Sequence, residues 1–87
     1  NRDKETRVYL EETLGKLIKY DREKNTELIR TLQAYFECHG NLKKVSEILF
    51  THYNTILYRM ERIQKISGYD LDCPEDRFNL EVALKIL

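Results

Sequence analysis

The stretch that decides the fold covers residues 41–68 and reads NLKKVSEILFTHYNTILYRMERIQKISG. It contains two amphipathic segments that are separated by a short link. Asn41 can cap the first segment as a helix over 41–49, because its apolar residues then share one helical face. These residues are Leu42, Val45, Ile48 and Leu49. Lys43 and Lys44 point outward from the same helix.

The second segment begins where Phe50 and Thr51 interrupt the apolar pattern, so that Thr51 or His52 can cap a helix over about residues 52–66. Gly68 ends this helix, and its apolar residues again share one face: Ile56, Met60 and Ile63. Two helices joined by so short a link cannot lie flat against each other, and they cross at about 90 to 120°. The stretch therefore predicts a helix-turn-helix unit.

One amphipathic helix precedes this unit and another follows it. Residues 28–36 carry an apolar stripe that Asn25 or Thr26 can cap and that Gly40 ends. Pro74 suits the first position of a final helix. That helix is apolar around most of its circumference, through Phe78, Leu80, Val82, Ala83, Leu84, Ile86 and Leu87. We expect some of this surface to meet the first helix, a second subunit or another domain.

The first residues of the chain predict one helix or two, because Gly15 interrupts an apolar stripe formed by Leu10, Leu14, Leu17 and Ile18. The polar run 21–25 is typical of a surface link. We therefore expect an all-α bundle of about five helices, a single domain over 1–87 that divides into 1–25, 26–68 and 69–87. Because the chain opens at Asn1 and enters helical sequence at once, we expect one module of a longer protein.

Composition excludes several classes of protein. No run of consecutive apolar residues exceeds three, so we expect no membrane span, no secretory signal, and a cytoplasmic location without a membrane partner. Cys38 and Cys73 are too few for a disulfide scaffold, and we expect two reduced thiols. With His39 and His52 they match no usual zinc spacing, so we expect no metal and no cofactor.

The formal net charge is zero, but the charges are unevenly distributed. Residues 41–68 contain five basic and two acidic side chains, and residues 69–87 contain two basic and five acidic ones. Such a bias acts locally, because the Debye length is about 8 Å at physiological salt. The helix-turn-helix segment would therefore attract an anionic partner electrostatically.

The outward face of the second helix has the chemistry of a DNA-reading surface. Its residues are Asn54, Tyr58, Glu61, Arg62 and Lys65, with Leu57 and Arg59 on the two flanks. A helix about 10 Å across fits a major groove about 12 Å wide, where Asn can pair with adenine and Arg with guanine. We expect Asn54 and Arg62 to contact base edges. The side chains expected to position the DNA backbone are Lys43, Lys44, His52, Thr55, Tyr58 and Arg59, and Tyr53 could do either.

The chain resembles the C-terminal helix-turn-helix domain of purine-catabolism (PucR) and carbohydrate-diacid (CdaR) regulators. The resemblance is carried by Leu28, Leu32, Tyr35, Gly40-Asn41, Leu49-Phe50, His52, Asn54-Thr55, Tyr58-Arg59 and Pro74-Glu75-Asp76-Arg77, and upstream by Leu14, Leu17, Tyr20 and Asp21. It implies a bacterial transcription factor in which this module binds double-stranded operator DNA and a preceding region of the same chain senses a signal. Tyr53 and Leu57 stand where the family usually has arginine, and Cys73 replaces an aspartate that would cap the last helix at a gain of about 1 kcal/mol.

Two other readings of the sequence lead to different classes. A helical dimerisation or protein-interaction module that has lost operator binding would explain Tyr53 and Leu57. An enzyme is disfavoured, because Cys38 and His39 project about 100° apart on a helix and cannot form a nucleophile–base pair. One module contacts few base pairs, so we expect a homodimer on two half-sites about 34 Å apart.

Overall fold

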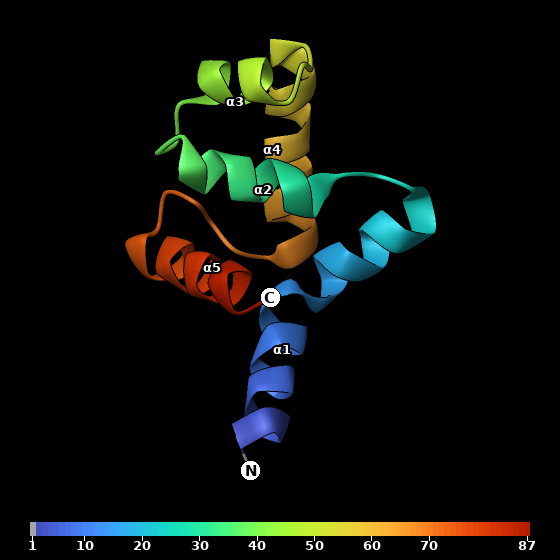
Figure 1. The fold of residues 1–87 in the computed structure, drawn as a ribbon, viewed down its shortest axis with the longest axis vertical. Coiled ribbons are helices and arrows are strands. Elements are labelled where there is room, and N and C mark those ends of the chain that lie inside the picture. The colour runs from blue at the N-terminus through green and yellow to red at the C-terminus, as the bar shows by residue number, and fades with distance from the viewer. Residues whose placement is uncertain (1) are drawn as a thin grey trace.

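The computed structural model describes residues 2–87, which form five helices and no strand (Figure 1). The helices are α1 (Arg2–Lys24), α2 (Leu28–Glu37), α3 (Leu42–Ile48), α4 (Tyr53–Ser67) and α5 (Pro74–Ile86). This confirms the expected all-α bundle of about five helices. None of the helices in residues 2–87 is both long and apolar enough to cross a membrane.

The N-terminal segment forms one helix that continues through Gly15 and bends near its middle (Figure 1). The prediction of a surface link at 21–25 is wrong for most of that run, because α1 extends to Lys24. Leu14 and Leu17 are fully buried on either side of Gly15, and their burial outweighs the cost of about 1 kcal/mol for a glycine inside a helix. Thr13 donates a hydrogen bond from Oγ1 to the Tyr9 carbonyl oxygen at 2.7 Å, a contact that often bends helices.

The start of α2 is not capped by the residues that the sequence predicts. Neither Asn25 nor Thr26 is the N-cap; that position is Glu27, whose side chain makes no capping hydrogen bond. Instead, the Asp21 carboxylate of α1 accepts hydrogen bonds from the backbone N–H groups of Leu28 at 2.8 Å and Ile29 at 2.9 Å. It also accepts one from the Thr26 hydroxyl. Asp21 therefore fixes the end of α1 to the start of α2.

The core lies where α4 meets α1, α2 and α3, and α5 closes it by packing against α1 and α2. The largest fully buried apolar side chains are Leu14, Leu17, Leu32, Val45, Ile56, Ile63 and Leu80. Ile56, Met60 and Ile63 form the buried face of α4, as predicted. The Tyr9 hydroxyl donates to the Asn79 carbonyl oxygen at 3.0 Å, so part of α5 meets the first helix as expected.

The helix-turn-helix unit consists of α3, a short turn and α4, and α3 crosses one end of α4 (Figure 1). Asn41 caps α3 as predicted, since its side-chain oxygen accepts from the Lys44 N–H at 3.1 Å. The prediction that Ile48 shares the buried face of Val45 is wrong. Because α3 ends at Ile48, this side chain is 45% exposed. Gly68 ends α4 with φ +79°, a left-handed conformation that glycine adopts without steric cost.

The turn between the two helices contains an unusual residue. Phe50 has φ +51° and is 96% exposed. A left-handed backbone costs a residue with a Cβ about 1 to 2 kcal/mol, and an exposed ring recovers almost nothing by burial. The turn is therefore strained at a side chain that packing does not stabilise.

Candidate nucleic-acid interface

The outward face of α4 is open to solvent. Asn54, Tyr58, Glu61 and Lys65 are all exposed, and Tyr58 is 60% exposed. The Asn54 amide makes no hydrogen bond within residues 2–87, so its donors and acceptor are available to a partner. The face that the sequence assigns to a partner is thus not occluded by the rest of the fold.

The first turn of α4 adds unused backbone donors. The N-cap is His52, which is one of the two caps that the sequence predicts. The His52 side chain makes no capping hydrogen bond. His52, Tyr53, Asn54 and Thr55 are all exposed. The N–H groups of this turn therefore have no side-chain acceptor and lie at the positive end of a helix of 15 residues.

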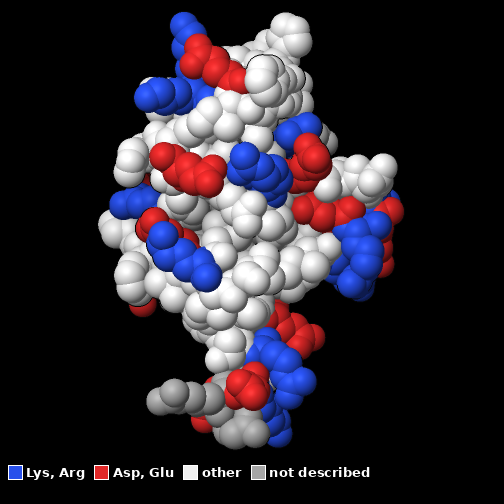
Figure 2. All heavy atoms as spheres, in the orientation of Figure 1, with Lys and Arg blue, Asp and Glu red and all other residues white. Residues whose placement is uncertain are grey.

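Lys43 and Lys44 lie in the first turn of α3 and are both exposed. The cap at Asn41 holds the backbone beneath them, which fixes where the two side chains leave the helix. In the view of Figure 2, Lys and Arg alternate with Asp and Glu, and no field of one sign covers that side of the molecule.

One flank of α4 carries two arginines that are tethered by hydroxyl groups. Arg59 Nη1 donates to Thr31 Oγ1 at 3.2 Å, and Arg62 Nη2 donates to the Tyr20 hydroxyl at 3.3 Å. The Arg62 Cζ also lies 5.4 Å from the centroid of the Tyr20 ring. The hydrogen bond to Tyr20 raises the pKa of Arg62, so this guanidinium stays charged.

The helical periodicity of α4 predicts Arg62 on the outward face, whereas the structure places it, partly buried, at the flank beside α1. The sequence does not predict that Tyr20 accepts a hydrogen bond from Arg62. The position of Tyr20 in the sequence could have indicated this contact. Tyr20 lies three residues after the buried Leu17, so it extends the apolar stripe of α1 and ends in a polar hydroxyl.

Four apolar side chains of the helix-turn-helix unit are exposed to solvent. We call Ile48, Phe50, Tyr53 and Leu57 the apolar patch; each is between 41% and 96% exposed. The two positions at which the resemblance expects arginine, Tyr53 and Leu57, are both in it. Residues 2–87 contain no cluster of three or more His, Cys, Asp or Glu side chains placed to hold a metal ion.

A short helix, a tight turn and a second helix with an open polar face define a helix-turn-helix domain. The chain belongs to the family described as the PucR C-terminal helix-turn-helix domain, whose profile matches residues 28–86. It is thus a domain of transcription regulators and not an enzyme.

Several relatives with assigned functions are similar to the chain. The DNA-binding transcriptional activator AdeR of Bacillus subtilis is 32% identical over 74 residues, which cover 85% of this chain and 18% of that protein. The purine catabolism regulatory protein of the same organism is 31% identical over 74% of this chain and 12% of its own length.

The carbohydrate diacid regulator of Escherichia coli is 42% identical over 71% of this chain and 16% of its own length. The chain therefore spans less than a fifth of each of these relatives. No solved structure matches the chain significantly.

Proposed function

We propose that this chain is the DNA-binding output domain of a transcription regulator and that α4 inserts into the major groove of operator DNA. The observation that supports this most directly is the division of α4 into two faces. Ile56, Met60 and Ile63 are buried, whereas Asn54 and Tyr58 are exposed on the opposite side. The relatives, which include a DNA-binding transcriptional activator, a purine catabolism regulatory protein and a carbohydrate diacid regulator, agree with this role.

Asn54 is the residue that we propose reads a base edge, because its free amide can pair with adenine in the major groove. The exposed positions around it would position the DNA backbone: Lys43, Lys44, His52, Thr55 and Tyr58, with Tyr53 suited to either role. A base contact by Arg62 stays a prediction. Because Tyr20 holds its guanidinium at the flank, we favour a phosphate contact for Arg62, as for Arg59.

The regulator would act as a homodimer on two half-sites about one helical turn apart. Phe78, Ile86 and Leu87 of the C-terminal segment are between 45% and 65% exposed, which offers apolar surface to a second copy or to another domain. The relatives are much longer than this chain, which supports a preceding sensory region. Light scattering of the full-length protein on operator DNA should detect two copies, and finding a monomer alone would remove this part of the proposal.

A protein-interaction module is the second candidate, and the apolar patch favours it. These four exposed apolar side chains, two of which lie on α4 itself, could dock a protein partner instead of DNA. Salt dependence separates the two functions, because each phosphate contact contributes about −0.9 to the slope of log K against log salt. A steep slope supports DNA binding, and a flat slope supports the interaction module.

Selection of bound oligonucleotides from a random pool by the full-length protein tests the proposed function. We expect an enriched pseudo-palindromic sequence. Recovery of unenriched DNA only, with an affinity that does not depend on salt, would contradict it.

A further inference from the structure

A hollow of about 460 Å³ lies along one flank of α4, and the outward face of that helix forms its edge. The lining residues come from three parts of the chain: Tyr20 from α1, residues 25–28 from the α1–α2 connection and the start of α2, and Thr55, Tyr58, Arg59 and Arg62 from α4. Two of these lining residues, Arg59 and Arg62, carry a positive charge, and one, Glu27, carries a negative charge.

The hydrogen-bond partners of the two guanidinium groups are neutral, although the Glu61 carboxylate also attracts Arg62 electrostatically. Thr31 accepts from Arg59 and Tyr20 accepts from Arg62, and neither arginine forms an ion pair with a carboxylate in the described part of the chain. Each guanidinium has five N–H donors, so one hydrogen bond apiece leaves most of them unused. Arg62 Nε is buried and has no hydrogen-bond partner among the described residues, so any ligand would be bound through the Nη groups.

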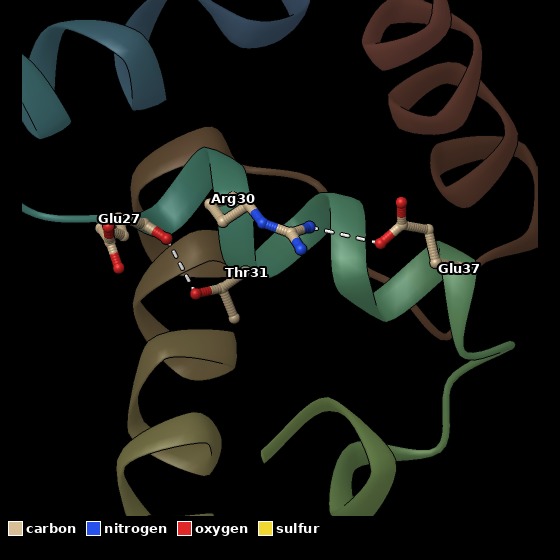
Figure 3. A network of polar contacts seen from close by, with 4 residues as sticks. All are labelled: Glu27, Arg30, Thr31 and Glu37. Carbon is tan, nitrogen blue, oxygen red and sulfur yellow. Dashed lines mark hydrogen bonds and ion pairs between the residues drawn. The ribbon is translucent and has the colours of Figure 1, made fainter. Parts of the chain in front are cut away.

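The arrangement is also held in place before any ligand arrives. Asp21 fixes the α1–α2 connection through the Leu28 N–H and the Thr26 hydroxyl. Thr31, which holds Arg59, is itself fixed because its hydroxyl donates to the Glu27 carbonyl oxygen at 2.8 Å (Figure 3). The Glu27 side chain is exposed, and solvent and salt therefore screen its charge.

We propose that this hollow seats a phosphate group of the DNA backbone, held by Arg59 and Arg62 while Asn54 reads the groove beside it. Planar guanidinium forks suit phosphate oxygens, and contacts of this kind fix the register of a protein on the duplex. The inference rests on the proposed function and deepens it. It makes Tyr20 and Thr31 positioning residues, since they act on the phosphate through the two arginines.

The first test titrates inorganic phosphate into the unmodified chain and follows the arginine Nε–H signals by NMR. We expect saturable shifts at Arg59 and Arg62 and none at Arg30. Arg30 is a matched control on α2, where it extends along the helix to an ion pair with Glu37 at 3.2 Å (Figure 3). Equal small shifts at all three arginines would mean general screening and would overturn the proposal.

The second test measures the salt slope of duplex DNA binding for the double variant Arg59→Gln/Arg62→Gln, with Arg30→Gln as control. We expect the double variant to lose about one unit of slope and the control to lose none. Thermal unfolding of each variant checks the fold, and Arg62→Lys, which retains the charge, should keep most of the salt slope of the unmodified protein.

The two proposals fail in different ways. If DNA binds with the same slope in the double variant, the phosphate seat is wrong and the DNA-binding function stands. If no variant and no salt concentration reveals DNA binding, the proposed function is wrong. In that case the inorganic phosphate titration alone tests the phosphate site. Shifts confined to Arg59 and Arg62 would show that the hollow binds free phosphate, and the absence of such shifts would overturn the proposed site.

Discussion

Arg62 on α4 donates a hydrogen bond to the hydroxyl of Tyr20 on α1, and its guanidinium carbon Cζ lies over the Tyr20 ring, 5.4 Å from the ring centroid. Tyr20 lies outside residues 28–86, the part of the chain that matches the family. The first helix therefore takes part in the geometry of the candidate DNA-binding helix, although it precedes the helix-turn-helix unit by many residues.

Replacing Tyr20 by phenylalanine removes the hydroxyl and keeps the ring. We expect a loss of about 1 kcal/mol in the free energy of unfolding, because the charged donor of Arg62 loses its acceptor in a partly buried place. Urea denaturation measures this, and Tyr58→Phe is the matched control because Tyr58 is 60% exposed. Equal stability of the two variants would show that the hydroxyl contributes nothing.

Replacing Asp21 by alanine removes the carboxylate that caps α2. We expect the variant to lose about 1 to 2 kcal/mol of stability, since two backbone N–H groups lose a charged acceptor. Glu23→Ala, on an exposed position of the same helix, should change stability by less than about 0.5 kcal/mol. The cap assignment fails if the two variants unfold at the same denaturant concentration.

Replacing Phe50 by glycine should stabilise the domain. Glycine adopts φ +51° without steric cost, and a ring that is 96% exposed gives up almost no buried area, so we expect a gain of up to about 1 kcal/mol. Thermal unfolding measures the change. A loss of stability would show that the Phe50 ring makes contacts in solution that its exposure does not suggest.

The two isoleucines of the helix-turn-helix unit should differ sharply on truncation. Ile63→Ala leaves a cavity in the core and should cost about 2 to 5 kcal/mol, whereas Ile48→Ala, at a side chain that is 45% exposed, should cost less than about 1 kcal/mol. Denaturant unfolding of both variants checks this. Similar costs would mean that Ile48 packs against the core after all.

The sequence predicts most of α4 because the information is local. Ile56, Met60 and Ile63 recur at helical spacing, and Gly68 supplies the stop. Ile48 obeys the same periodicity and is still exposed, because α3 ends there and the chain turns away. Periodicity assigns a face to a helix but does not say how far the helix extends.

The contacts that shape the candidate site could not be predicted in the same way. Tyr20 meets Arg62 across 42 positions of sequence, and Arg59 meets Thr31 across 28. Such pairs depend on how the helices pack. The Asp21 cap is nearer in sequence, but it needs a helix that continues into the polar run 21–25, where composition favours a loop.

We propose that the open face of α4 reads DNA bases, and a comparison of Asn54→Ala with Lys44→Ala on a selected operator and on random DNA tests this. We expect Asn54→Ala to weaken operator binding by about 1 to 3 kcal/mol while random DNA binds almost as before. Lys44→Ala should weaken both by the same factor. Equal losses on the two DNAs for Asn54→Ala would contradict the claim that this residue reads a base.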